Sequence, residues 1–126
     1  MGNDEFAEQL VETRRHFAAM LLGRIAEIDA CLPALTGAGR DVPGAVCTAH
    51  RKVSDLCGNG PTLGFITTGQ AARVCQGFLQ PASHDKRGLT EQEMANLRKG
   101  LLSLRAAAQN DLQPQTSASL AAAHVQ

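Results

Sequence analysis

Three residues with metal-binding or nucleophilic side chains are spaced so that one helix would carry them on the same side. Cys47, His50 and Cys57 are 3 and 7 residues apart, and helical periodicity places such positions near one face. They would supply three of the four ligands of a zinc site. Zinc ligands more commonly come in short paired motifs on loops, and the four cysteines include no CxxC pair. We therefore expect two core cysteines beside a surface histidine, and no metal.

The composition is incompatible with several other kinds of chemistry. Lys and Arg total 12, as do Asp and Glu, and Trp and Tyr are absent, so the basic excess and stacking rings of nucleic-acid binders are missing. No apolar run approaches the roughly 20 residues that span a bilayer, and the acidic start MGNDEF does not resemble a secretory signal. A nucleotide-binding loop, a nucleophile–base pair and an acid cluster are also lacking. We expect a cytoplasmic protein that is not an autonomous enzyme, uses no cofactor, and binds neither nucleic acid nor membrane.

An amphipathic stripe predicts a long first helix over residues 3–35. Its apolar positions recur at spacings of three, four and seven, as on one helical face. The stripe consists of Phe6, Leu10, Phe17, Leu21, Ile25, Ile28, Leu32 and Leu35. Pro33 should loosen or end the last turn. Alternatively, the segment forms two helices joined near Arg14 and Arg15.

Proline and glycine delimit the second helix. A Gly-rich loop at 36–42 precedes Pro43, which suits the first turn of a helix. That helix should extend to about residue 57, because the run from Gly58 to Pro61 weakens or ends helices.

Two more helices are expected after this run. The third covers about 68–80, with Val74 among its inward residues, and a polar loop at 81–88 follows it. Thr90 and Glu93 have the spacing of a capping box at the start of the fourth helix. The sum is an all-α, up-down four-helix bundle.

The last residues differ in composition from the four helices. After residue 110 the sequence is rich in Gln, Ser and Ala and loses its periodicity. Such a segment cannot bury enough apolar surface to offset the entropy of ordering. We expect one bundle domain at 1–110 and a disordered tail at 111–126.

The segment between the second and third helices is the most specific feature. It reads VSDLCGNGPTLGF over 53–65 and continues as ITTGQAARVCQGFL. This resembles the core motif of histidine-phosphotransfer (Hpt) domains of two-component phosphorelays, especially forms common in alphaproteobacteria. In that family a glycine follows the phosphate-accepting histidine by four residues, and a turn similar to T-L-G-F leads to the next helix. Gly58 matches the glycine and residues 62–65 match the turn, while Gly69 fits a position where the next helix packs closely.

The resemblance implies a signalling module whose partner is a response-regulator receiver domain or a hybrid histidine kinase. The receiver would supply the acidic residues and Mg²⁺, and nearby Lys or Arg would help to balance the phosphoryl charge. A small residue at Gly58 would leave room for the receiver loops. The implied binding residues are Arg51, Lys52, Ser54, Asp55, Gly58 and Gly64.

The acceptor position departs from the family pattern. Counting back from Gly58 places Ser54 at the histidine position, and the nearest histidine is His50. In one hypothesis the helix has gained a turn and His50 is the acceptor, about 6 Å further from the turn. In the other, the protein is a pseudo-Hpt module, because a serine hydroxyl without a neighbouring base is a weak nucleophile. Asp55 favours the second hypothesis, since like charge opposes an incoming phosphoryl group.

Three functions are therefore expected alternatives. The first is a phosphoryl carrier that uses His50. The second is a regulator or inhibitor that docks a receiver or kinase without taking phosphate. The third is a purely structural helical bundle whose motif resemblance is accidental, since bundle folds host many functions.

Overall fold

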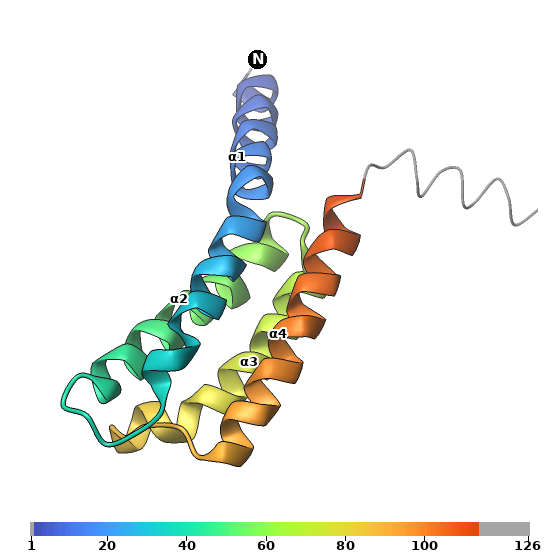
Figure 1. Ribbon diagram of the computed structural model, residues 1–126. Helices are drawn as coiled ribbons and strands as arrows, with labels where there is room; N and C mark the ends of the chain where they lie inside the picture. Colours follow the sequence, from blue (N-terminus) through green and yellow to red (C-terminus); the bar gives the residue numbers. More distant parts are fainter. Residues whose placement is uncertain (1, 114–126) are drawn as a thin grey trace, which may run out of the picture.

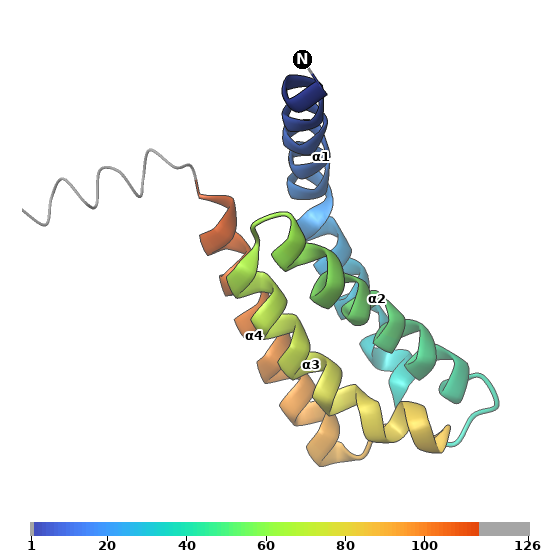
Figure 2. The ribbon, with the colours of Figure 1, turned by 180° about the vertical axis from the view of Figure 1, so that it is seen from behind.

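The computed structural model describes residues 2–113, and this part of the chain is all-α. Its helices are α1 (Gly2–Cys31), α2 (Val42–Thr62), α3 (Ile66–Asp85) and α4 (Glu91–Leu112), with one turn of 3₁₀ helix at Leu32–Leu35. They run up and down beside one another (Figures 1 and 2), and α3 packs extensively against both α2 and α4. The expected up-down four-helix bundle is confirmed.

The core lies along the bundle axis and draws on all four helices. Its fully buried large side chains include Leu21, Ile25, Ile28, Leu56, Leu79, Leu97 and Leu104. Together with smaller buried residues such as Val46, Ala49 and Val53 of α2 and Ala72, Cys75 and Ala82 of α3, they form one apolar stripe per helix, and burial of these stripes stabilises the bundle. None of the described helices combines the length and the apolar character needed to cross a membrane.

The first helix is a single element that is longer than its neighbours. It ends at Cys31, before Pro33, as predicted, because a proline ring lacks the N–H that the helix would need. Its N-terminal half extends past the α2–α3 turn (Figures 1 and 2). The apolar stripe is therefore not buried at Phe6 and Leu10, which are both exposed: Leu10 lies at the edge of the bundle beside the end of α2, and Phe6 lies one turn further out.

The second helix is longer than expected. It continues through Gly58 and Pro61 to Thr62, so the predicted end near residue 57 is wrong. Interior glycines cost a helix only about 1 kcal/mol each, and Pro61 lies in the last turn, so the helix ends one residue after the N–H that the proline lacks. Gly60 is buried at the turn, where an added Cβ would lie 3.2 Å from the carbonyl oxygen of Phe65.

The third helix also exceeds its predicted range. It spans Ile66–Asp85 and contains Pro81, so most of the expected loop at 81–88 is helical. Lys86 follows the last helical residue, and its φ of 54° places it in the left-handed region. Its N–H is bonded to the carbonyl of Ser83, and the N–H of Arg87 is bonded to the carbonyl of Ala82. This is a typical helix C-terminus.

The start of the fourth helix matches the sequence pattern. The Thr90 hydroxyl accepts a hydrogen bond from the Glu93 N–H at 3.1 Å, and the Glu93 carboxylate accepts one from the Thr90 N–H at 2.8 Å. The predicted capping box is confirmed. Arg87 adds a two-pronged ion pair to the same carboxylate, with nitrogen–oxygen distances of 2.7 and 3.1 Å.

The end of the fourth helix corrects the expected boundary of the tail. α4 runs to Leu112, so residues 111 and 112 belong to the bundle. Asp111 accepts hydrogen bonds from the N–H and the hydroxyl of Thr68 at the start of α3, at 2.7 and 2.8 Å. Residues 114–126 of the expected tail lie outside the described part of the chain.

Candidate functional site

Two hydrogen bonds join α2 to α3 at the positions that the sequence singled out. His50 Nε2 lies 2.8 Å from Gln80 Oε1, and Gln76 Nε2 donates to Ser54 Oγ at 2.8 Å. His50 and Ser54 are four residues apart, as are Gln76 and Gln80, so the two bonds occupy successive turns of the paired helices. We call these four residues the α2–α3 ladder.

The contact with Gln80 suits one tautomer of the imidazole. An amide oxygen only accepts hydrogen bonds, so the bond to Gln80 forms in the tautomer of His50 that carries its proton on Nε2, in which Nδ1 holds the lone pair. The side chain is partly exposed. Partial exposure leaves the ring accessible from solvent, while Gln80 fixes its orientation.

The hydroxyl of Ser54 is hydrogen-bonded to a neutral amide and not to a base. Its neighbour Gln76 is a neutral amide that donates to the hydroxyl oxygen. A serine becomes a strong nucleophile only when an adjacent group takes its proton. Ser54 therefore acts as a hydrogen-bond partner of α3 and not as an activated nucleophile.

A thiol lies next to the ladder but is poorly suited to nucleophilic chemistry. Cys57 Sγ is 3.6 Å from Gln76 Oε1 and 3.8 Å from the Gly69 carbonyl oxygen. Burial raises the pKa of Cys57, although Arg73 opposes the shift, and burial together with the nearby Cys57 raises the pKa of Cys75 to about 12. Both thiols are protonated at neutral pH, and the thiolate is the reactive form.

The three residues considered as zinc ligands do not converge. Cys47 is exposed, whereas Cys57 is directed toward α3 and His50 toward Gln80. Among residues 2–113, no group of three or more His, Cys, Asp and Glu side chains could hold a metal ion.

The charged residues of the expected docking face lie on other sides of α2. Lys52 Nζ is 3.9 Å from Glu27 Oε1 of α1. Lys52 and Asp55 both line a polar hollow of about 300 Å³ between α1 and α2. Arg51 is exposed. The residues predicted from the motif therefore lie on different sides of α2. Ser54 faces α3, Lys52 and Asp55 lie toward α1, and Arg51 is on the outer surface.

The two glycines of the motif differ in what they do. A Cβ added at Gly58 would have no neighbouring atom within 4 Å. This exposed position therefore leaves open surface one helical turn from Ser54. Gly64 has a φ of 94°, a left-handed conformation that favours glycine, and it lies against the guanidinium of Arg14. It belongs to the α2–α3 turn, about 18 Å of helix from His50.

Close packing places α3 against α2. A Cβ at Gly69 would lie 2.4 Å from Pro61 Cγ, so only a glycine permits this approach. The expectation that Gly69 marks tight packing of the next helix is confirmed. Around it, the Phe65 N–H bonds to the Gly60 carbonyl at 2.8 Å and closes the turn.

Sequence reasoning missed Gln76, Gln80 and Asp111. The i, i+4 spacing of the two glutamines matches that of His50 and Ser54, but the pairing depends on how α3 is aligned with α2. Asp111 was assigned to the tail because the periodicity of α4 fades before it. No pattern in the sequence connects it to Thr68, which lies 43 residues earlier.

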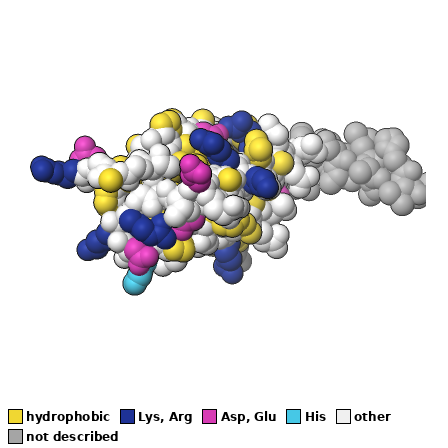
Figure 3. Space-filling view, turned by 60° about the horizontal axis from the view of Figure 1, so that its bottom comes forward, with side chains coloured by type: hydrophobic (Ala, Val, Ile, Leu, Met, Phe, Trp, Pro, Cys, Tyr) yellow, Lys and Arg dark blue, Asp and Glu magenta, His cyan; other side chains and the backbone are white. Residues whose placement is uncertain are grey.

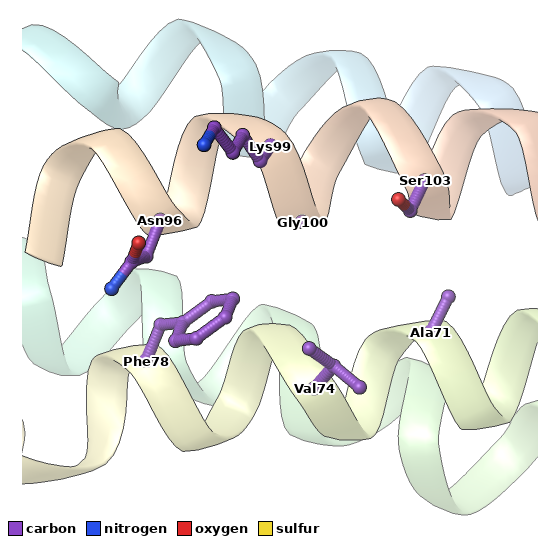
Figure 4. Close-up of a pocket in the computed structure, with 7 residues that line it drawn as sticks. All are labelled: Ala71, Val74, Phe78, Asn96, Lys99, Gly100 and Ser103. Atoms are coloured by element: carbon purple, nitrogen blue, oxygen red, sulfur yellow. The ribbon is translucent and has the colours of Figure 1, made fainter.

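A separate groove lies between α3 and α4 (Figure 4). It encloses about 250 Å³ and is lined by Ala71, Val74, Phe78, Asn96, Lys99, Gly100 and Ser103. Val74 was expected to face the core but is 53% exposed at this groove. The small Gly100 of α4 lies against Cys75 and Phe78, which leaves Val74 at the edge. No residue of the ladder lines this groove.

The charges are mixed over the surface. On the face shown in Figure 3, basic, acidic and hydrophobic side chains are interspersed. This agrees with a net charge of zero. No family model, no curated protein and no solved structure matches the chain.

Proposed function

We propose that this chain is an Hpt-type signalling module that docks a receiver or histidine-kinase domain through α2 and α3, with His50 as its phosphate acceptor. The observation that supports this is the oriented, partly exposed imidazole at the α2–α3 boundary, held by Gln80. The open surface at Gly58 and the exposed guanidinium of Arg51 lie on the same helix. Arg51 would contribute positive charge near the phosphoryl group.

The proposed transfer needs a lone pair on the imidazole. An imidazole nitrogen attacks the phosphorus of an aspartyl phosphate, an N–P bond forms, the bond from phosphorus to the aspartyl oxygen breaks, and aspartate leaves as a carboxylate. With Nε2 donating to Gln80, the lone pair is on Nδ1. Attack from Nε2 requires the bond to Gln80 to open and the ring proton to move to Nδ1.

A second candidate function is a pseudo-Hpt regulator that binds the same partners without accepting phosphate. It is favoured by Ser54, which occupies the acceptor position of the ungapped motif and is bonded to the neutral Gln76. Asp55, one residue further, adds negative charge that opposes an incoming phosphoryl group.

Phosphoryl transfer from a labelled receiver tests the proposal. The purified chain is incubated with phosphorylated receiver domains from its own genome, alongside His50→Ala, Ser54→Ala and His84→Ala. His84 is an exposed histidine at the end of α3 and serves as the matched control. We expect acid-labile, base-stable label in the wild type, Ser54→Ala and His84→Ala, and none in His50→Ala.

The alternatives give different results. Label that survives His50→Ala contradicts the assignment of the acceptor. An unlabelled wild type that still binds a receiver or kinase, with the same affinity in His50→Ala, supports the pseudo-Hpt regulator. An unlabelled chain that binds neither kind of domain supports a structural bundle.

A further inference from the structure

The N-terminal half of α1 carries an apolar surface that no other described helix covers. We define the overhang as residues 5–16, whose side chains are all exposed; Phe17 is the first buried residue of the helix. Phe6, Leu10 and Val11 are 67%, 45% and 54% exposed. Figures 1 and 2 show this end of α1 standing clear of the bundle. Clustered apolar side chains with a charged rim mark interaction surfaces.

A hollow of about 260 Å³ lies at the base of the overhang. It is lined by Leu10, Val11, Arg14, Thr62, Leu63 and Gly64. The Arg14 guanidinium lies 5.9 Å from the centre of the Phe65 ring and packs against Gly64, so it is held in place beside the hollow. The same chain thus presents a protruding Phe6 and an apolar hollow. The hollow lies at the level of Arg14, eight residues or about 12 Å along α1 from Phe6.

The overhang is acidic toward its free end and mostly basic at its base, where Glu12 lies beside two arginines. Glu5 and Glu8 lie near its free end, and Arg14 and Arg15 lie near its base. Two overhangs side by side in parallel would oppose like charges, whereas an antiparallel pair would place each acidic end beside the other copy's basic base. Arg15 is bonded to Glu12 within the chain at 3.2 Å, but both side chains are largely exposed and can exchange partners.

We propose that the overhang is a self-association surface on which a second copy pairs in antiparallel orientation, with the two-fold axis near Leu10. Leu10 is midway between Phe6 and Arg14. A two-fold axis at Leu10 therefore places Phe6 of each copy beside Arg14 of the other copy, where the hollow opens. Each copy then contributes one Phe6 and one hollow, so the contact is made twice. A membrane is a poorer occupant, because Glu5, Glu8 and Glu12 would be repelled by anionic lipid.

This inference is independent of the proposed function. The hollow is bordered by the C-terminal end of α2, about 18 Å of helix from His50. Pairing through the overhang therefore leaves the α2–α3 ladder available to a receiver. Failure of one proposal leaves the other standing.

Sedimentation equilibrium of the full-length chain over a wide concentration range tests the pairing. We expect a monomer–dimer equilibrium whose dissociation constant rises about tenfold or more in Phe6→Ala, because buried aromatic anchors dominate small interfaces. Leu102→Ala is the matched control: Leu102 is 68% exposed on α4, away from the overhang, and its loss should leave the constant unchanged. Both residues are exposed, so neither variant should unfold.

Charge reversal tests the orientation. The double variant Glu5→Lys, Glu8→Lys and the single variant Arg15→Glu should each dimerise more weakly than wild type. Mixed together, they should form a heterodimer, because the basic free end of the first variant then faces the more acidic base of the second.

Three results would overturn the proposal. One is a wild-type chain that stays monomeric throughout while cosedimenting with anionic lipid vesicles, which would assign the surface to lipid. Another is a monomer whose melting temperature falls in Phe6→Ala, which would assign the surface to another segment of the same chain. The third is a dimer that weakens equally in Phe6→Ala and Leu102→Ala.

Discussion

The two ends of α3 are secured in different ways, although α4 supplies a carboxylate to both. At the N-terminal end, Gly69 lies directly against Pro61, and Asp111 binds the backbone and hydroxyl of the buried Thr68. At the C-terminal end, the Arg87 guanidinium pairs with Glu93 at a partly exposed site. The first end depends on steric fit and partly buried hydrogen bonds, and the second depends on charge.

The packing of Gly69 against Pro61 bears on the candidate site because it joins α3 to α2 and so helps to set their alignment, whereas both carboxylates join the ends of α3 to α4. Gln76 and Gln80 reach Ser54 and His50 only in that alignment. A one-residue shift of α3 would rotate its side chains by about 100° and separate both pairs. Steric contacts are sensitive to a single added methyl group, whereas the ion pair responds to pH.

The largest effect is expected from Gly69→Ala. Its Cβ would lie 2.4 Å from Pro61 Cγ, so α2 and α3 must separate, and overpacking of this kind costs about 1–3 kcal/mol. Gly77→Ala is the control on the same helix, because a Cβ there meets nothing within 4 Å and Ala favours helix by up to about 1 kcal/mol. Denaturant unfolding should show the first variant destabilised and the second unchanged or stabilised. Equal stability of the two variants would contradict the close contact.

A smaller loss of stability is expected from Asp111→Ala. The change leaves the N–H of the buried Thr68 without its carboxylate partner, which should cost about 1–2 kcal/mol. Asp41→Ala is the control, because Asp41 precedes α2 without a side-chain capping bond. A change in the free energy of unfolding that is no larger than the control's would show that Asp111 does not hold α3.

At the other end of α3, Glu93→Gln should change the acid sensitivity of the protein. The ion pair with Arg87 and the bond from the Thr90 N–H lower the pKa of Glu93 from 4.5 to about 2. The unfolded chain therefore binds this proton more readily, so the stabilisation is present above about pH 4.5 and lost as pH falls toward 2.

The free energy of unfolding of Glu93→Gln should be lower than that of wild type by on the order of 1 kcal/mol at neutral pH, a small value because the site is partly exposed. This difference should shrink between about pH 4.5 and pH 2. Thermal melts across this range measure it, with Glu91→Gln in the same helical turn as the control. A difference that is constant with pH would refute the role of the ion pair.

The smallest change in stability is expected from Gln80→Ala, about 0.5–1 kcal/mol for a partly exposed hydrogen bond. Its informative readout is the imidazole of His50, whose Nε2 loses its acceptor. Nitrogen NMR of the histidine ring should show a shift toward a mixture of tautomers. Gln70→Ala, an exposed position on α3, should leave the His50 signals unchanged. Identical spectra for Gln80→Ala and wild type would show that Gln80 does not orient the His50 imidazole.

The elements of the bundle could be predicted because they depend on local patterns. The apolar stripes and the pair Thr90 and Glu93 are encoded within a few residues of each other, and the capping box is present with both of its bonds. Pro33 marked the end of α1 for the same reason. The ends of α2 and α3 were placed too early because Pro61 and Pro81 are tolerated close to a helix terminus.

The contacts between helices could not be predicted in the same way. Periodicity shows which face of α1 is apolar, but the exposure of Phe6 depends on how far the other helices extend. Likewise, the partners of His50 and Thr68 are 30 and 43 residues away. These pairings follow from the alignment of whole helices.

Amide NMR mapping of the full-length chain tests our proposal that the α2–α3 surface around His50 docks a receiver domain. We expect addition of a cognate receiver domain to shift or broaden signals of residues 47–58 of α2 and 76–80 of α3. Signals of the overhang and of the α3–α4 groove should be unaffected. Perturbations confined to either of those surfaces, or a spectrum unchanged by every receiver of the same genome, would contradict the account.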